Sequence, residues 1–134
     1  EISLIDDSIG FNISFSNKPD EEKLKKVIKL SCCEEFINLL PNKLNTFIGS
    51  NGSKLSGGQR QRIGIARALY QDKLIYIFDE VTSALDDSTE KQVIKNLNKY
   101  LNEKTVFFIT HKKQILEFVD QIIEVKNKKV FFKD

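Results

Sequence analysis

Residues 55–62 combine residue types that can bind a phosphate group at the start of a helix. The stretch reads LSGGQRQR, and Gln59–Leu69 has the composition of a helix. Ser56 is a common N-cap residue, and the glycines Gly57 and Gly58 let a ligand approach the backbone closely. Because a helix start presents unpaired N–H groups and the positive end of a dipole, we expect the Ser56 hydroxyl and the Gly58 amide to face a phosphate oxygen. A capped helix after a Gly-Gly turn is the purely structural alternative.

Two adjacent carboxylates follow an apolar run a short distance downstream. Residues 74–78 are uninterruptedly apolar, which is typical of a strand buried on both faces of a mainly parallel sheet. Asp79 follows directly and suits Mg²⁺, an ion that keeps most of its water and takes few protein ligands. Glu80 can polarise an attacking water, and such bases contribute roughly 10²–10⁴-fold in rate. The alternative is a strand that simply ends in solvated acids.

Two later segments place further polar residues next to predicted elements. Residues 81–86 read VTSALD and precede a helix, for which Asp87 and Glu90 fit a capping box. Apolar residues at helical spacing in this helix predict core contacts, namely Val93, Ile94, Leu97 and Leu101. His111, the only histidine, follows the β-branched and aromatic run 105–110, which predicts a second buried strand.

Together these motifs resemble the nucleotide-binding domain of an exporter-type ABC (ATP-binding cassette) ATPase. LSGGQ resembles its signature motif, residues 74–80 its Walker B motif, VTSALD its D-loop, and His111 its switch histidine. The resemblance implies an α/β fold, the C-terminal part of a P-loop NTPase-like (RecA-like) domain with its α-helical subdomain. It also implies a division of the chain: about 17–70 would be the helical subdomain with the signature helix. About 71–134 would hold Walker B, the D-loop, the H-loop and the C-terminal strands.

The resemblance implies a role for each matching residue, with ATP and Mg²⁺ as cofactors. Asp79 is expected to bind the metal, Glu80 to act as the catalytic base, and His111 to contact the γ-phosphate and position the catalytic water. Nucleotide contacts, in part across a dimer interface, are expected from the signature and the D-loop, namely Ser56, Gly57, Gly58, Gln59, Ser83 and Asp86. The basic side chains of the signature helix are expected to be solvated on its outer face.

The segments before LSGGQ also match the family. Residues 7–15 look like the stretch after the Q-loop of exporters, and residues 46–52 sit where exporters meet the coupling helices of their membrane domains. One helix is predicted to open at residues 19–22 with Leu24, Val27 and Ile28 on one face, and another to run from Cys32 to Leu40.

A P-loop string, G-x-x-x-x-G-K-[ST], does not occur in the 134 residues. That loop cradles the triphosphate with backbone amides and a lysine. We therefore expect the P-loop, the adenine-stacking aromatic residue and the Q-loop glutamine upstream of Glu1, with this chain as the C-terminal part of a longer protein. The chain alone is then expected to hydrolyse no ATP.

Composition fits one globular piece of a larger assembly. Hydrophobic residues make up 40% and charged residues 30%, as in ordinary globular domains. The net charge of +2 does not favour nucleic acid as a partner. The adjacent cysteines Cys32 and Cys33 lack metal-ligand neighbours and predict a reducing compartment. A C-terminal hairpin is predicted from Gln121–Val125 and Val130–Lys133.

The family resemblance implies specific partners. A second nucleotide-binding domain would form a head-to-tail dimer around two ATP molecules, and a transmembrane domain, fused upstream or separate, would hold the chain at the cytoplasmic face of a membrane. Two alternatives stay open: a soluble ABC ATPase of DNA repair or translation, and a non-catalytic truncated module that pairs with a complete cassette. The transported substrate and the choice between homodimer and heterodimer are not encoded in these motifs.

Overall fold

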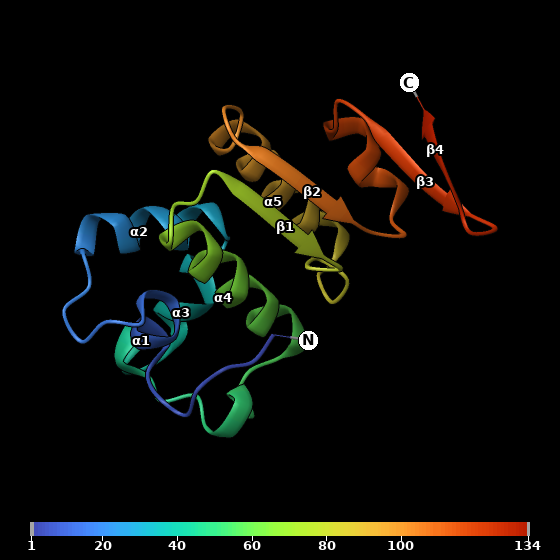
Figure 1. Cartoon of the computed structure of the whole chain (residues 1–134). Helices are drawn as coiled ribbons and strands as arrows, with labels where there is room; N and C mark the ends of the chain where they lie inside the picture. Colours follow the sequence, from blue (N-terminus) through green and yellow to red (C-terminus); the bar gives the residue numbers. More distant parts are fainter. Residues whose placement is uncertain (1, 134) are drawn as a thin grey trace.

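The computed structural model describes residues 2–133, in which helices and short strands alternate along the second half (Figure 1). Three short helices come first, then a longer helix, a strand–helix–strand unit and a terminal hairpin. In chain order these are α1 (Ile9–Ser14), α2 (Glu21–Leu30), α3 (Glu34–Leu39), α4 (Gly57–Tyr70), β1 (Ile75–Asp79), α5 (Asp87–Tyr100), β2 (Thr105–Ile109), β3 (Ile122–Lys126) and β4 (Lys129–Lys133). Short 3₁₀ turns lie at Lys43–Asn45, Ser50–Gly52 and Lys113–Phe118. Within this part of the chain no helix has both the length and the apolar character needed to cross a bilayer.

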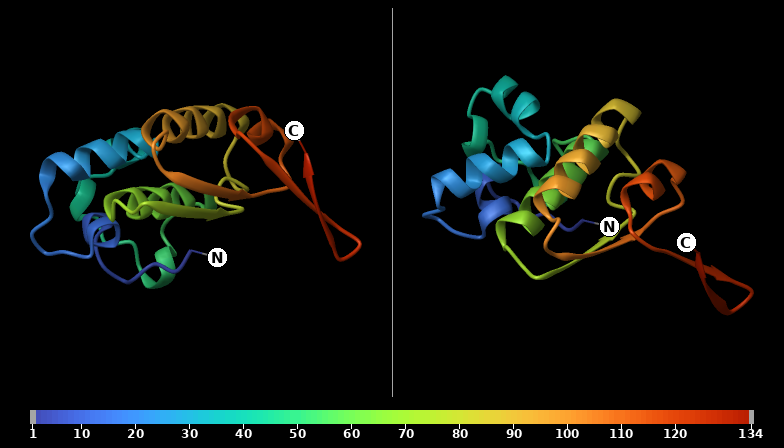
Figure 2. Two further views of the ribbon diagram at one scale, coloured as in Figure 1. Left: turned by 45° about the horizontal axis from the view of Figure 1, so that its top comes forward. Right: turned by 90° about the horizontal axis from the view of Figure 1, so that it is seen from above.

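The strands form two separate pairs. β1 and β2 are parallel, with Ile75 opposite Thr105 and Asp79 opposite Ile109, and α5 makes the connection between them. β3 and β4 form an antiparallel hairpin that extends away from the rest of the molecule in both views of Figure 2. Helices α1 and α2 pack against α4. The predicted parallel sheet and the predicted hairpin are both confirmed.

Capping side chains define where the main helices begin. Asp20 caps α2 by accepting the Lys23 backbone N–H, and Ser56 caps α4. The cap of α5 is Asp86, whose carboxylate accepts the Thr89 N–H at 3.0 Å. The predicted capping box of Asp87 with Glu90 is therefore wrong, because the helix starts one residue earlier and Glu90 falls beyond the third helical position.

One hydrophobic core joins the helical first half to the strand unit. It extends from Leu4 to Ile115 and includes the residues predicted for the inner faces of α2 and α5, namely Leu24, Val27, Ile28, Val93, Ile94, Leu97 and Leu101. Ile63, Ile65 and Leu69 of α4 are completely buried at its centre. Each such side chain contributes about 1.5–3 kcal/mol through burial. The division of the chain near residue 70 stays a prediction.

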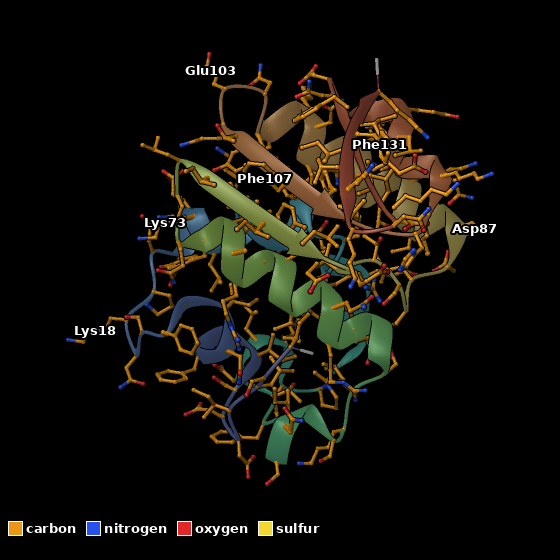
Figure 3. All side chains as sticks on the ribbon, turned by 45° about the vertical axis from the view of Figure 1, so that its right-hand side comes forward. Lys18, Lys73, Asp87, Glu103, Phe107 and Phe131 are labelled. Carbon is orange, nitrogen blue, oxygen red and sulfur yellow. The ribbon has the colours of Figure 1, made fainter. Side chains whose placement is uncertain are left out.

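Only one face of the β1–β2 pair is buried among the described residues. Tyr76 and Phe78 are each 4% exposed, whereas Ile77 is 66% exposed. Phe107 on β2 is likewise exposed (Figure 3). Residues 2–133 thus cover only one face of this two-stranded sheet. The apolar residues on the other face are exposed, as expected for a strand whose burial on both faces needs more than these residues.

Glu90 is a charged residue inside the core, and a lysine neutralises it. Its side chain is 1% exposed, and one carboxylate oxygen accepts a hydrogen bond from the Lys112 ammonium at 3.0 Å. The same ammonium donates to the Thr82 carbonyl at 3.1 Å. Lys112 thus connects α5 with the loops that follow β1 and β2.

We predict that the exposed sheet face makes the isolated chain self-associate. Replacing Ile77 and Phe107 by threonine, which keeps strand propensity, should reduce association without loss of stability. Sedimentation velocity over a range of concentrations measures this effect. As a control on the other face, Phe78→Ala should lower the free energy of unfolding by about 3–5 kcal/mol. A monodisperse, cooperatively melting wild-type monomer would contradict the prediction.

We predict that Lys112→Met destabilises the protein by about 2–3 kcal/mol, because it leaves the Glu90 carboxylate buried without a cation. The value lies below that of a fully buried pair because the Lys112 side chain is 28% exposed. The double variant with Glu90→Leu should recover most of the loss. Urea unfolding measures the free energy of unfolding of the single and double variants. Lys113→Met, at an exposed lysine, is the matched control. A loss equal to that of the control would argue against the pair.

Candidate functional site

The start of α4 has the local structure that the LSGGQ motif predicts. The Ser56 hydroxyl accepts the Gln59 backbone N–H at 3.2 Å, and the Gln59 side chain accepts the Ser56 backbone N–H at 2.9 Å. This reciprocal capping box fixes both residues while leaving the hydroxyl proton of Ser56 available. Ser56 is exposed to solvent. The helix start can therefore meet a ligand without rearrangement.

The two glycines have a second role within the chain. A side-chain carbon at Gly58 would lie 3.0 Å from the Ala84 carbonyl oxygen, and one at Gly57 would lie 3.3 Å from the Ala84 side chain. Any larger residue at Gly58 would push the helix start away from the loop 80–86. The pair thus permits close contact with this loop as well as the predicted close approach of a ligand.

The carboxyl ends of β1 and β2 bring three predicted site residues to one edge. Asp79 ends β1 and is exposed. The Glu80 carboxylate accepts the His111 backbone N–H at 3.2 Å and lies 3.9 Å from the His111 Nε2. The Glu80 side chain is 39% exposed and that of His111 completely exposed. Both groups are therefore accessible to water and to a ligand.

Glu80 adopts an unusual backbone conformation. Its φ angle is +48°, a left-handed value that costs a non-glycine residue about 1–3 kcal/mol unless surrounding contacts fix it. Its N–H donates to the Ile109 carbonyl at 2.9 Å, and its own carbonyl accepts the Ser83 N–H at 3.1 Å. These bonds, together with that of its carboxylate to His111, hold the side chain beside the loop after β2.

The loop 80–86, which ends where Asp87 is labelled in Figure 3, is bonded internally. Asp86 accepts the Ser88 hydroxyl at 2.6 Å in addition to the Thr89 N–H, and these hydrogen bonds, that of Ser88 first, hold the pKa of the Asp86 carboxyl well below its ordinary range. The Ser83 hydroxyl accepts a hydrogen bond from Gln61 at 2.8 Å. The roles predicted for Ser83 and Asp86 at a nucleotide stay predictions, whereas their structural roles within the loop are visible.

Sequence reasoning missed Gln61 and Lys112, which hold this loop from two sides. Gln61 lies one helical turn after Gly57 and so faces the same way, a spacing that could have revealed it. Lys112 reaches the Thr82 carbonyl and Glu90, and its position directly after His111 is the only sequence signal for it.

The basic residues of α4 differ from expectation. Arg62 donates to the Cys32 carbonyl at 2.6 Å, and Arg67 donates to the Asn12 carbonyl at 2.7 Å. Arg60 donates to the Leu55 carbonyl at 2.8 Å. The prediction that the arginines beside the glutamines are solvated is wrong, because the guanidinium groups of Arg60 and Arg62 donate to backbone carbonyls of the chain.

Asp79 is the one side chain predicted to bind Mg²⁺. Among residues 2–133 no cluster of three metal-ligating side chains occurs. Asp79 is exposed at the right edge to supply an oxygen to that ion. The neighbouring cysteines are both free, and burial raises the pKa of the Cys33 thiol to about 12. Neither cysteine is within a metal-ligating group in this part of the chain.

A cavity among the helices lies away from these residues. It has a volume of about 640 Å³ between α2, the start of α3 and α5, and Lys26, Cys32 and Tyr100 are among its lining residues. None of the predicted site residues borders it. The candidate site is instead an exposed edge, formed by the start of α4 and the loops after β1 and β2.

Comparison with known proteins gives a consistent assignment. The family model described as ABC transporter matches residues 5–83. The ATP-dependent lipid A-core flippase of Dechloromonas aromatica (strain RCB) is 42% identical over 125 residues, which cover 92% of this chain and 21% of the flippase. The corresponding flippase of Vibrio parahaemolyticus serotype O3:K6 (strain RIMD 2210633) is 41% identical over 126 residues, covering 92% and 22%.

A solved structure agrees with the sequence matches. The structure of a bacterial Atm1-family ABC exporter with ATP bound superimposes with a TM-score of 0.85 at 33% identity, covering 90% of this chain and 22% of that one. The chain thus spans about one fifth of the length of the curated relatives it matches. Because the family model matches more than half of the residues and the fold agrees, the chain belongs to the ABC transporter family and has the fold of its ATPase domain.

Proposed function

We propose that this chain is part of the ATP-binding and ATP-hydrolysing engine of an ABC exporter, which couples hydrolysis to transport across a membrane. The observation that carries the proposal is the hydrogen bond between the Glu80 carboxylate and the His111 N–H at the carboxyl edge of β1 and β2. This bond holds the proposed catalytic base, Glu80, next to the residue proposed to contact the γ-phosphate, His111. The names of the similar proteins support an exporter over a soluble ABC ATPase.

The residues divide into two groups with separate tasks. Glu80 would polarise and deprotonate the attacking water, and His111 would contact the γ-phosphate and position that water. Asp79 would supply one oxygen to Mg²⁺, which neutralises charge on the phosphates when bound. Ser56, Gly57, Gly58 and Gln59 would place hydrogen-bond donors and the positive end of the α4 dipole on a phosphate.

The two groups would serve two different ATP molecules. Gly58 lies against the Ala84 carbonyl, where an added side-chain carbon would be 3.0 Å away, so the helix start contacts the loop of its own copy at this point. In a head-to-tail dimer, each copy's α4 would face the other copy's Glu80. A P-loop, supplied outside these residues, and a transmembrane domain, fused or separate, would complete the assembly at the cytoplasmic face of a membrane.

We predict that Glu80→Gln in the full-length protein lowers the rate of ATP hydrolysis by about 10²-fold or more, because the amide cannot accept a proton from water. ATP binding should persist. Phosphate release and binding of radiolabelled ATP measure the two effects. Glu103→Gln, at an exposed glutamate between α5 and β2, is the control and should leave the rate unchanged. Full activity of Glu80→Gln would remove Glu80 from the proposed role.

We predict no ATP hydrolysis by residues 1–134 alone, because they contain no P-loop string to bind the triphosphate. Phosphate release by the purified chain, at millimolar ATP and Mg²⁺, is the measurement. Turnover that disappears in Glu80→Gln would show that the chain is active by itself and would refute the prediction. Turnover that persists in that variant would indicate a contaminating enzyme.

A further inference from the structure

The side-chain amide of Gln61 is fully used in hydrogen bonds to the loop after β1. Its nitrogen donates to the Glu80 carbonyl at 3.1 Å and to the Ser83 hydroxyl at 2.8 Å. Its oxygen accepts the Ala84 backbone N–H at 2.8 Å. Both N–H donors and the carbonyl oxygen of the amide therefore have partners in one short loop. A solvated surface glutamine would show no such arrangement.

These bonds fix the backbone on one side of the Glu80 carboxylate. The Glu80 carbonyl receives hydrogen bonds from both Gln61 and the Ser83 N–H, and its amide is bonded to Ile109. With both peptide groups fixed, the left-handed conformation of Glu80 is determined, and so is the direction of its side chain toward His111. Loss of the Gln61 bond would release one of these restraints.

The same glutamine belongs to the helix whose start carries the phosphate-binding motif. Gln61 lies on α4 five residues after Ser56, and Gly58 on the same helix lies close to the Ala84 carbonyl, where an added side-chain carbon would be 3.0 Å away. Helix start and loop are thus in direct contact through both backbone packing and the Gln61 amide. A shift of one would displace the other.

We propose that Gln61 is a positioning residue that couples the two ATP sites of the assembled protein. The inference rests on the proposed function, in which Ser56–Gln59 act on the ATP of the partner copy while Glu80 acts on the ATP of its own copy. Binding of a phosphate at the start of α4 is then transmitted through Gln61 to the backbone of Glu80. Gln61 touches no reacting atom.

The test is steady-state ATP hydrolysis by the full-length protein as a function of ATP concentration, normalised to bound ATP. Two variants change the contact: Gln61→Ala deletes all three bonds, and the isosteric Gln61→Glu removes the donor to the Glu80 carbonyl while keeping an acceptor for the Ala84 N–H. The control is Gln92→Ala, which removes an exposed glutamine whose side chain bonds only to Asn96 on the same helix. Melting temperatures of all variants report on folding.

We expect wild type and Gln92→Ala to show a Hill coefficient above 1, since two coupled sites allow values up to about 2. Gln61→Ala should have a coefficient of about 1 and a kcat per bound ATP that is about tenfold lower, because small misplacements of a base are costly. Gln61→Glu should also lower the Hill coefficient and the kcat per bound ATP. If the alanine variant does not fold, the glutamate variant alone tests the proposal. A merely structural role would lower the melting temperature but leave both quantities unchanged per bound ATP.

Two results would overturn the inference without touching the proposed function. One is a Gln61→Ala or Gln61→Glu protein with the kcat per bound ATP and Hill coefficient of Gln92→Ala. The other is an active wild-type protein with a Hill coefficient of 1. Absence of hydrolysis by the wild-type protein would instead refute the proposed function.

Discussion

The parallel pairing of β1 with β2 determines where the polar groups that follow the two strands lie. Because the strands run in the same direction and Asp79 is opposite Ile109, the residues that follow both strands meet at one edge. Glu80 comes to bond the backbone of His111 for this reason alone. An antiparallel arrangement of the same two segments would place these residues at opposite ends of the sheet. The chemistry of the site therefore depends on α5, which makes the parallel connection possible.

The loop between β1 and α5 is held from two directions, and this explains residues that look unremarkable in sequence. Gln61 binds it from α4, and Lys112 binds the Thr82 carbonyl from the segment after β2. Lys112 also neutralises Glu90 inside the core. The loop is thus fixed to both elements that carry the other predicted site residues. Such a loop can transmit a displacement between them, whereas a freely moving loop could not.

Local signals in the sequence were sufficient for most elements. The helix opening at residues 19–22, the cap at Ser56 and the apolar spacing in α2 and α5 correctly predicted helices, since these features act within one or two turns. The hairpin was correctly predicted from the basic turn at residues 126–129. Long-range features could not be obtained in this way. Which strand face is covered, and that Arg62 binds the Cys32 carbonyl, depend on contacts between segments distant in sequence. Gln61 shows the same limit, because its partners lie about twenty residues away.

The exposed sheet face and the predicted metal ligand are linked by the geometry of a strand. Side chains alternate along β1, so Asp79 points to the same side as Ile75 and Ile77. These isoleucines form, with Phe107 and Ile109 of β2, the apolar face that the described residues leave exposed. Burial of this face is favourable by about 25 cal/mol per Å² of apolar surface removed from water. Any segment or partner that covers it must also place atoms beside Asp79. In the proposed ATPase, covering this apolar face and completing the nucleotide site would be one structural event, in which burial of the strand residues supplies free energy for bringing further groups to the Asp79 carboxylate.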